Sequence, residues 1–487
     1  MRIHVRTVLN VTGIVMMVIG VAMLPSFLVS LYCDEPRVWH SFIFAMLTCI
    51  VPGAFCFVLT TGEHESLKLR DGFLLVSLCW IVASVVGALP FLTTGVLTNP
   101  FDAFFESVSG FSTTGASVIS DVESLPKGIL FWRSFTHWIG GVGILVFAIA
   151  LMPSLGISGQ NVMSTDTPGL SLGKISPKLS DSMRTLYITY LLFTVVETIL
   201  LKVGGMSLFD ALIHTFGTVG TGGFSSYNEG FAHFDSPFIH IVVIVFMFLC
   251  GINFNLYYLS IRRGIFNLFR DIEFRFYALT ILVVSVTIAL ALLVSGGFNH
   301  FTSAILDSVF QTVSIMTTTG YTTADYIKWP IVCQMLLLCL MFIGGCSSST
   351  SGGVKSIRIL VIIKYIHFGI RTRLHPNSIE PIRINGKSIP AETVSGVTYH
   401  IYLYIAIMFI GTFILSFENI NMETCFSSVI TCLGNIGPAF GDIGTIHTFV
   451  SYSSLSKLVL SAAMLAGRLE LYTLFILFTP RFWNADH

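Results

Sequence analysis

The chain has few charged residues. Asp, Glu, Lys and Arg together make up 11% of its 487 residues, whereas hydrophobic residues make up 54%. A soluble protein carries roughly twice that share of charge. The apolar residues come in runs of about 20, which are long enough to cross the roughly 30 Å of hydrocarbon in a bilayer. The composition therefore excludes an ordinary soluble domain and predicts an all-α polytopic membrane protein.

Signatures of several other classes are absent. The ten cysteines include no C-x-x-C pair, which argues against a disulfide framework or a metal centre. No H-E-x-x-H, G-x-S-x-G or P-loop pattern is present, so we expect neither an enzyme nor an organic cofactor or nucleotide site in this chain. The formal net charge of zero gives no reason to expect a nucleic-acid partner.

One pattern occurs four times along the chain. A short amphipathic stretch runs into a turn rich in Thr and Gly, and each turn lies between two long apolar segments. An Asp lies 13 positions before the last glycine of the first three turns, and Thr424 takes that place in the fourth. The repetition predicts a unit of span, re-entrant pore loop and span, used four times in a pseudo-fourfold arrangement around a central pore. The turn residues are Thr113, Thr114 and Gly115; Thr221, Gly222 and Gly223; Thr318, Thr319 and Gly320; and Asn435, Ile436 and Gly437.

The apolar segments predict ten transmembrane helices. Two additional N-terminal helices, near 8–32 and 38–60, come before the repeats. We expect the paired spans of the repeats near 72–94 and 129–151, 185–204 and 237–260, 276–296 and 331–363, and 396–417 and 454–479. The corresponding units are an N-terminal helix pair at 1–66 and pore repeats at 67–160, 180–263, 270–370 and 390–487.

Basic residues indicate the orientation in the membrane. They lie in the N-terminal segment, after the second span and in the linkers between repeats. The segment that holds the second turn has no Lys or Arg between Lys202 and Arg262. By the positive-inside rule the linkers and both termini are cytoplasmic, and the turns face outward. The stretch 364–392 and the basic linker 262–275 are possible docking surfaces for a cytoplasmic partner, or ordinary basic loops.

The turns have the chemistry of an ion filter made of backbone. A half-length helix that dips in from outside presents carbonyl oxygens at its C-terminal end, where the helix dipole favours cations. Glycine allows a positive φ, so successive carbonyls can point at one line, and a ring of carbonyls can replace the water of a monovalent cation. No carboxylate lies in the four turns, which disfavours Ca²⁺ and Mg²⁺. Asn435 and Ile436 make the fourth turn the outlier.

Several polar residues accompany the turns at matched positions. Glu106, His214 and Gln311 share one pore-helix position, with Ser428 in the fourth repeat, and we expect them to support the turns. Three aspartates are expected to cap the pore helices at their N-termini, and the alternative is that they attract cations to the mouth of the pore. Other polar residues inside the spans either line a path or, more commonly, make packing hydrogen bonds. The aspartates are Asp102, Asp210 and Asp307, and the other polar residues are His137, Glu197, Asn253 and Asn255.

The second span of repeat three is interrupted. Residues 344–353 contain four glycines, four serines and a threonine inside an otherwise apolar stretch, and each glycine costs about 1 kcal/mol in a helix relative to alanine. We expect a loop below the turns there. Arg468, in the middle of the last span, costs roughly 2.5–3.5 kcal/mol on insertion scales and needs partners. The loop carbonyls are better candidates than Glu470, which lies on a different helix face.

At these residues the chain resembles the TrkH/KtrB superfamily of K⁺ transport proteins, and TrkH most closely. The similarity covers nearly the whole length and rests on segments 216–225, 318–322, 344–353 and 467–471. It implies K⁺ as the transported ion, bound at the turn residues, with uptake across a bacterial inner membrane. It also implies a homodimer and a cytoplasmic nucleotide-binding regulator of the TrkA type. The implied gate is the loop with Gly344, Gly345, Gly352 and Gly353, together with Arg468 as an electrostatic barrier beneath the filter.

Two other functions stay open. Within the same fold, the residues alone do not decide between K⁺ uptake and a Na⁺-coupled or Na⁺-permeable cation transporter. A secondary transporter of an organic solute is the other alternative, but it would need two inverted halves and ligand-specific side chains. The four repeats here share one orientation and contain few charged groups. Coupling of transport to H⁺ or Na⁺ is not encoded in a recognisable way.

Overall fold

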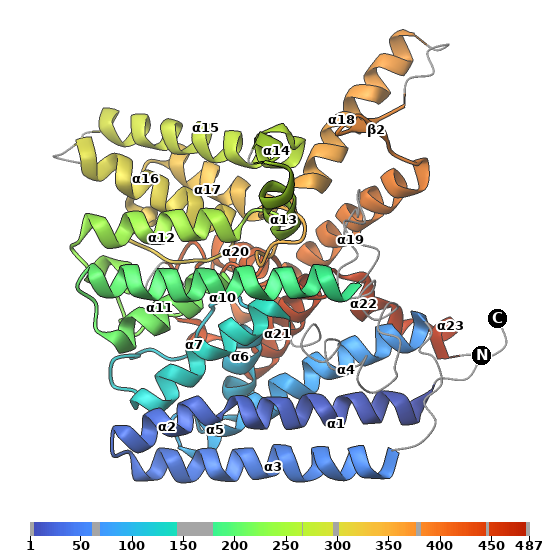
Figure 1. Ribbon diagram of the computed structural model, residues 1–487. Helices are drawn as coiled ribbons and strands as arrows, with labels where there is room; N and C mark the ends of the chain where they lie inside the picture. The colour runs from blue at the N-terminus through green and yellow to red at the C-terminus, as the bar shows by residue number, and fades with distance from the viewer. Residues whose placement is uncertain are drawn as a thin grey trace.

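The computed structural model describes residues 4–60, 69–143, 179–264, 266–295, 301–375, 381–444 and 448–483. Within these residues the fold consists of helices and one small pair of strands. Figure 1 shows most of the long helices side by side, with shorter helices gathered at the centre. The predicted all-α polytopic fold is confirmed.

Three helices form the N-terminal unit: α1 (Val5–Ala22), α2 (Leu24–Tyr32) and α3 (Pro36–Thr60). α1 and α2 meet at Met23 and form one apolar span of 28 residues. α3 returns beside α1, and the two backbones approach closely because Gly13 faces Gly53. A Cβ on either glycine would lie 2.7 Å from the carbonyl oxygen of the other. Small residues permit this kind of close helix contact in membranes.

Each of the four repeats begins with a long helix and continues into a shorter pore helix that leads to a turn. The pore helices hold 12 to 16 residues, too few to cross a bilayer. The first helices are α4 (Leu69–Gly87) with its continuation α5 (Leu89–Thr93), α10 (Leu179–Val203), α15 (Ile272–Val294) and α19 (Ala391–Leu415). The pore helices are α6 (Pro100–Phe111), α11 (Leu208–Gly220), α16 (Phe301–Met316) and α20 (Met422–Gly434).

The second helices of the repeats are short, and those of repeats two to four are followed by a bend or a loop. Repeat one has α7 (Lys127–Val142), repeat two α12 (Pro237–Cys250) and α13 (Phe254–Arg263), repeat three α17 (Ile331–Ile343) and α18 (Ser356–Leu374), and repeat four α21 (Ser454–Arg468) and α22 (Tyr472–Phe475). The bend is 89° in repeat two and 115° in repeat four.

These bends correct two predicted spans. The spans predicted near 237–260 and 454–479 are each bent, whereas the break predicted at 344–353 is confirmed. Hydropathy does not register a bend between two apolar segments, and the local signals are single residues. In repeat two, Asn253 caps the new helix through its side chain, which accepts from the Asn255 amide at 2.9 Å. Of the predicted span 129–151, residues 144–151 lie outside the described residues.

Among the described residues, six helices are long and apolar enough to cross a membrane, or up to eight if each bent pair is one span. α17, taken by itself, has 13 residues and is too short for that test. The chain is therefore a multi-pass membrane protein, and the count of ten spans stays a prediction.

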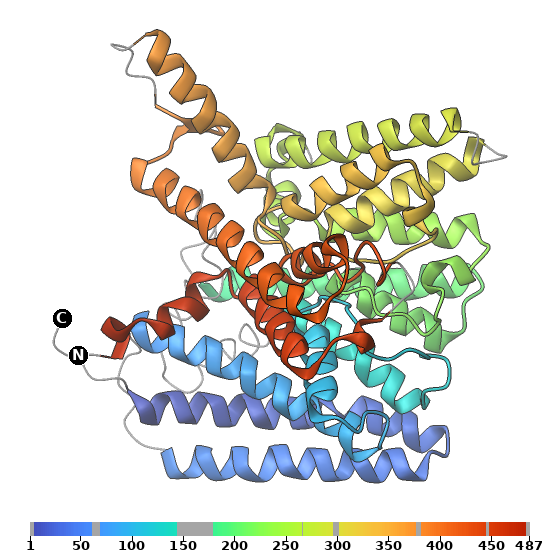
Figure 2. The same cartoon turned by 180° about the vertical axis from the view of Figure 1, so that it is seen from behind.

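A feature that the sequence analysis did not anticipate lies between α18 and α19. Strands β1 (Arg383–Ile384) and β2 (Lys387–Ser388) form an antiparallel hairpin, with Arg383 opposite Ser388. Figure 2 shows α18 and this hairpin projecting from the helical body. The remaining elements are η2 (Gly230–His233), α14 (Phe266–Arg270), η3 (Tyr326–Lys328), η4 (Ser416–Glu418), η5 (Phe449–Ser451), η6 (Ile476–Phe478) and α23 (Pro480–Trp483).

The beginning and the end of the described chain meet on one side of the molecule. The backbone amide of His4 donates to the Asp71 carboxylate at the start of α4, with N and Oδ1 3.1 Å apart. The neighbouring Arg70 guanidinium lies 5.0 Å from the centre of the Phe482 ring in α23. An even number of membrane crossings between these ends fits this arrangement.

Candidate functional site

All four pore helices end in the same backbone motif. The first residue after α11 and α20, and the second after α6 and α16, has a left-handed conformation, with φ of 55° at Thr221, 54° at Asn435, 57° at Thr113 and 58° at Thr318. The next amide bonds to the carbonyl five residues earlier, as in the Thr114 N to Ser109 O bond of 2.9 Å. This is the Schellman pattern of helix ends, which usually has glycine at the left-handed position. Equivalent bonds run from Gly222 to Gly217, from Thr319 to Ser314 and from Ile436 to Thr431.

Threonine at the left-handed position is unusual. A β-branched residue with positive φ is an outlier, and backbone strain of this kind costs of order 1–3 kcal/mol per residue. Thr113, Thr221 and Thr318 are fully buried, so the surrounding protein fixes their conformation. Strain that is maintained at matched positions is typical of functional sites.

Two residues after each left-handed residue comes a glycine that also has a positive φ. The φ angles are 81° at Gly115, 84° at Gly223, 80° at Gly320 and 103° at Gly437. Only glycine adopts such angles readily. Gly223, and not Gly222, is therefore the equivalent glycine of repeat two, as the spacing from Asp210 predicted.

The four glycines connect the turns into a closed ring. Each glycine is so close to the next turn that an added Cβ would overlap or tightly contact the carbonyl oxygen of the residue before that turn's glycine. The order of contacts follows the order of the repeats and returns from the fourth to the first. The contacts are Gly115 to Gly222, Gly223 to Thr319, Gly320 to Ile436 and Gly437 to Thr114.

Hydrogen bonds outside the turns join neighbouring repeats in the same cyclic order. Repeat one meets repeat two where the Val122 amide donates to Asn228 Oδ1 at 2.8 Å. Repeats two and three meet through Tyr321, whose hydroxyl donates to the His214 carbonyl at 3.0 Å. The other two junctions are Tyr326 hydroxyl to Ala439 carbonyl at 3.1 Å and Phe449 amide to Ser117 carbonyl at 2.8 Å. The pseudo-fourfold arrangement thus holds beyond the ring itself.

Asn435 makes the fourth turn equivalent in shape despite its different sequence. Its Nδ2 donates to Thr114 Oγ1 and to the Met464 carbonyl, at 2.9 Å each. Asn tolerates the left-handed conformation better than most residues. The fourth turn, the outlier by sequence, therefore takes the same backbone path and is directly bonded to the first.

A cavity opens on one side of the ring. It has a volume of about 120 Å³ and is lined by all four ring glycines and by the segments that follow them. At its edge, Asn228 Nδ2 donates to Asp121 Oδ1 at 3.0 Å. This hydrogen bond lowers the pKa of the Asp121 carboxyl below its usual value, so a negative charge is present near the cavity at neutral pH. Cations are favoured there.

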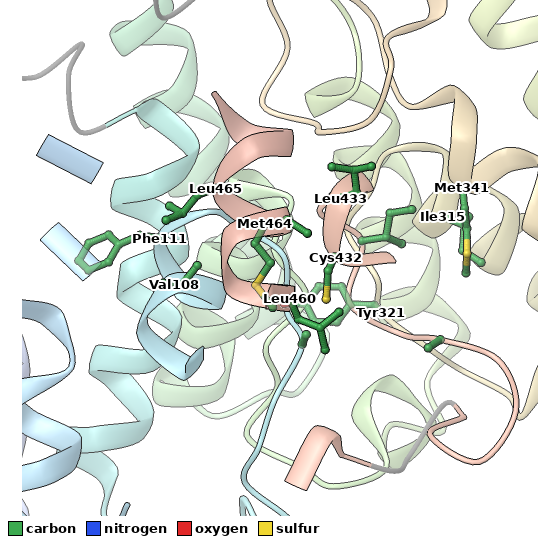
Figure 3. Close-up of a cluster of buried hydrophobic side chains, with 14 of the residues drawn as sticks. Val108, Phe111, Ile315, Tyr321, Met341, Cys432, Leu433, Leu460, Met464 and Leu465 are labelled. Atoms are coloured by element: carbon green, nitrogen blue, oxygen red, sulfur yellow. The ribbon is translucent and has the colours of Figure 1, made fainter. Parts of the chain in front are cut away.

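Behind the turns the pore helices are packed in apolar side chains. Figure 3 shows Val108 and Phe111 of α6 beside Leu460, Met464 and Leu465 of α21, with residues of the third and fourth repeats on the other side. The labelled side chains are nearly or fully buried. Tight packing of this kind limits movement of the backbone it surrounds.

On the other side of the ring lies the loop of repeat three, residues 344–355. The Gly352 amide donates to the hydroxyl of Thr318 in the third turn at 2.6 Å. A Cβ on Gly352 would lie 2.5 Å from the Gly434 carbonyl oxygen, at the end of the fourth pore helix. The predicted loop below the turns therefore exists, and it touches two of them.

A buried carboxylate secures this loop from the neighbouring helix. Glu273 of α15 accepts hydrogen bonds from the Ser347 amide at 2.5 Å and from the Ser347 hydroxyl at 2.8 Å. Further backbone bonds tie Cys346 to the Gly251 carbonyl at 2.9 Å and Phe254 to the Ser348 carbonyl at 3.1 Å. Glu273 was not predicted from the sequence, because its role depends on a contact 74 residues away.

Arg468 lies at the bend of repeat four and reaches the loop. Its guanidinium donates to the Thr350 carbonyl at 2.8 Å and to the Gly140 carbonyl of α7 at 2.7 Å. The predicted carbonyl partners are confirmed. Glu470 instead forms an ion pair with Arg358 of α18. One arginine therefore connects the first, third and fourth repeats.

Two of the four polar residues expected to support the turns, Glu106 and His214, bond to the segment directly after their own turn. Glu106 accepts from the Val118 amide at 2.9 Å and from Arg133 Nε at 2.6 Å. His214 bonds to the Ser225 hydroxyl at 3.0 Å, and Ser428 to the Tyr452 hydroxyl at 3.0 Å. Gln311 is buried without a hydrogen-bond partner among the described residues. Arg133 was missed by the sequence analysis, although a buried arginine in an apolar helix is a readable signal.

The three aspartates do not cap the pore helices as predicted. The caps are Asn99 and Ser207 in the first two repeats. Asp102 pairs instead with Lys457 of α21 at 2.7 Å. The other two bond to residues that follow their own turns: Asp210 to the Ser226 hydroxyl at 2.9 Å and Asp307 to the Thr323 hydroxyl at 2.8 Å.

Three of the remaining polar residues differ in their surroundings. Asn253 is a helix cap, as described above, and Glu197 is buried on α10. His137 is different, because it is fully buried beside the second turn.

Comparison with known proteins identifies the family. Residues 39–485 match the TrkH family, described as cation transport proteins. The chain belongs to the TrkH family. It is thus a transport protein and not an enzyme, and the predicted resemblance is confirmed.

Individual relatives match this TrkH-family chain over nearly its full length. The Trk system potassium uptake protein TrkH of Halomonas elongata is 34% identical over 482 residues, covering 98% of this chain and 99% of the relative. The Trk system potassium uptake protein TrkG of Escherichia coli is 36% identical over 486 residues, covering 99% of each. The crystal structure of the potassium transporter TrkH from Vibrio parahaemolyticus matches with a TM-score of 0.90 at 32% identity, covering 99% of this chain and 100% of the other.

Proposed function

We propose that this chain takes up K⁺ across a bacterial inner membrane through the ring of turns, which acts as its selectivity filter. The observation that carries the proposal is the closed cycle of contacts between each ring glycine and a carbonyl of the next turn. Carbonyl rings replace the hydration shell of K⁺ in channels. Relatives that match nearly the whole chain are named potassium uptake proteins. The twelve turn residues named above are the proposed K⁺ ligands.

The loop at 344–355 and Arg468 form the proposed gate. The loop lies against the third and fourth turns, on the side of the ring opposite the cavity, and Arg468 bonds to one of its carbonyls. A positive charge at this point opposes the passage of a cation. Conduction then requires the loop to leave its position. It would lose the hydrogen bonds that it donates to Thr318 and Glu273 and the one that it accepts from Arg468.

The proposal has three further parts. A cytoplasmic nucleotide-binding partner of the TrkA type regulates the protein, the protein assembles as a homodimer, and both termini are cytoplasmic. The projecting part of the molecule supports a docking surface. A cavity of about 520 Å³ there is lined by basic residues of α18 and β1, among them Lys364, Arg371 and Arg383. An acidic surface on a partner would complement it. The basic linker at 262–275 is the second candidate for docking.

Selectivity of the purified protein in liposomes tests the filter. Gly115, Gly223 and Gly320 are each changed to Ser, and Rb⁺, K⁺ and Na⁺ fluxes are compared with wild type. Each added side chain would overlap a carbonyl of the next turn, so the K⁺ over Na⁺ ratio is expected to fall about tenfold, which corresponds to about 1.4 kcal/mol.

The matched control is Gly369→Ser on α18, where an added Cβ meets nothing within 4 Å. This variant should keep the wild-type ratio. Unchanged selectivity in all three folded ring variants would rule out the carbonyl filter. Uptake of an organic solute by the same liposomes would instead favour a secondary transporter.

A further inference from the structure

The second turn is built differently from the first and third. In those turns the middle residue is a threonine whose hydroxyl bonds to the hydroxyl two residues earlier. The distances are 2.7 Å between Ser112 and Thr114 and 2.8 Å between Thr317 and Thr319. The second turn has glycine at both matched positions, Gly220 and Gly222, so it lacks this internal bond.

The imidazole of His137 occupies the space of the side chain that is missing at Gly222. A Cβ on Gly222 would overlap the ring of His137, with the Nδ1 atom 2.5 Å away. A Cβ on Gly220 would lie 2.6 Å from the His137 carbonyl oxygen. Gly222 is therefore required by the imidazole, and Gly220 by the backbone of α7. Any larger residue at either position would displace α7 or the turn.

His137 is also fixed from the other side. Its Nδ1 donates to the Gly110 carbonyl, near the end of the first pore helix, at 2.8 Å. Its ring lies 4.1 Å from the centre of the Phe224 ring, directly after the second turn. The guanidinium of Arg133, one helical turn earlier on α7, lies 3.5 Å from the centre of the same Phe224 ring. The side chain thus joins the first and second quarters of the ring.

The fourth turn shows another solution for the same position. There the middle residue is Ile436, and its side chain packs against its own repeat, with Cδ1 3.0 Å from a Cβ built on Gly434. In the first, third and fourth turns, the middle residue thus fills the space behind its own carbonyl with its own side chain. In the second turn, a side chain from α7 fills that space. Nε2 of His137 has no hydrogen-bond partner among the described residues, so packing and the Nδ1 bond are what hold the ring in place.

We propose that His137 is a specificity-determining residue, whose imidazole takes the place of a threonine side chain and sets the position of the Gly222 carbonyl in the ring. This inference rests on the proposed filter. The Gly222 carbonyl is the one that the Gly115 contact touches, so a displacement of His137 changes the contact between the first and second turns. His137 acts on the ion through the turn and is not itself an ion ligand.

A set of exchanged side chains tests the proposal in liposomes. His137→Ala leaves a space behind the second turn, and Gly222→Thr collides with the imidazole. Each single change should lower the K⁺ over Na⁺ ratio about fivefold. The double variant H137A/G222T restores the threonine pattern of the other turns and should return to within about twofold of wild type, because residues in contact show coupling of this size.

His137→Asn separates positioning from mere stability. Its side-chain amide can donate to the Gly110 carbonyl but does not fill the space of the ring. Thermal unfolding should therefore return toward wild type in H137N, while selectivity stays reduced. His240→Ala, a change at a half-buried histidine of α12, serves as the control and should leave selectivity unchanged.

Two results would overturn the inference. Additive effects in the double variant would mean that His137 and Gly222 do not occupy one space. Wild-type selectivity in H137A would mean that the imidazole does not position the turn. Gly115→Ser and Gly320→Ser are measured alongside to separate a failure of the His137 inference from a failure of the proposed filter. Loss of selectivity in these two variants would support the filter even if His137 had no effect. Wild-type selectivity in those variants as well would end both proposals.

Discussion

The second helices of repeats two and three are both interrupted, but by segments of different length. The interruption itself belongs to the fold, whereas the long loop belongs to repeat three. In repeat two only residues 251–253 lie between α12 and α13, and the helix resumes at an Asn cap. In repeat three, residues 344–355 lie between α17 and α18. The interruption is shared, and repeat four has it too. What is particular to repeat three is the length of the inserted loop and its contacts with the turns.

The two interruptions also touch each other. The Gly251 carbonyl of repeat two accepts from the Cys346 amide of the loop, and the Cys250 carbonyl accepts from the Thr350 hydroxyl at 3.3 Å. The short interruption thus exposes two carbonyls that accept hydrogen bonds from the loop of repeat three. A bend exposes backbone groups that need partners in the membrane, and the loop supplies them.

Removing the long loop should have the largest effect. Deletion of 345–352 joins Gly344 to Gly353, whose backbones are already adjacent, since a Cβ on Gly353 would lie 2.9 Å from the Gly344 Cα. We expect K⁺ flux to rise at least about tenfold in liposomes, because the proposed gate loop is then removed. A tenfold rise corresponds to a barrier lower by about 1.4 kcal/mol. Uptake below wild type in a well-folded deletion variant would contradict a gate here.

Arg468→Gln should have the next largest effect. The change removes the positive charge and weakens the bonds to the Thr350 and Gly140 carbonyls. Flux should rise severalfold, with a smaller change in thermal stability, since bonds to charged groups contribute about 1.5–3 kcal/mol. Arg481→Gln on the exposed face of α23 is the matched control. Equal flux in both variants would remove Arg468 from the gate.

Glu273→Gln should loosen the loop more mildly. A neutral amide accepts hydrogen bonds from Ser347 less strongly than a carboxylate, so closed and open positions come closer in free energy. We expect a flux increase of about twofold to fivefold, measured in the same assay. Glu392→Gln is the matched control, because Glu392 also lies in the first turn of its repeat's first helix but is exposed. A similar increase in the control would point to surface charge as the cause.

Asn253→Ala should have the smallest effect on transport. It tests whether the interruption of repeat two takes part in gating, as the loop of repeat three is proposed to do. Loss of the cap on α13 costs about 1 kcal/mol, so thermal unfolding should occur at a lower temperature. Flux at temperatures where the protein is folded should stay at the wild-type level, because the short interruption does not cross the path. Raised flux in this variant would show that both interruptions take part in gating.

The sequence predicted the arrangement of this molecule better than its fine contacts. Hydropathy and the matched Thr and Gly turns were sufficient for the repeats, the pore helices and the loop, because these depend on local composition. The bends after Cys250 and Arg468 were not predicted, since the segments on both sides of each bend are apolar. The predicted aspartate caps were wrong because Asn99 and Ser207, a few residues earlier, took that role.

The contacts of the site depend on residues far apart in the chain. Arg133 with Glu106, Glu273 with Ser347 and Arg358 with Glu470 join positions separated by 27, 74 and 112 residues. No local pattern specifies such partners. Gly222 stands where the first and third turns have threonine, and the position of His137 explains the glycine.

The ring of turns has no first or last member, because the contact from Gly437 to Thr114 closes the cycle. A carbonyl in such a cycle cannot shift without moving a neighbour on either side. The aperture should therefore respond as one unit. A substitution in one quarter should lower the discrimination between ions by moving neighbouring carbonyls as well as its own.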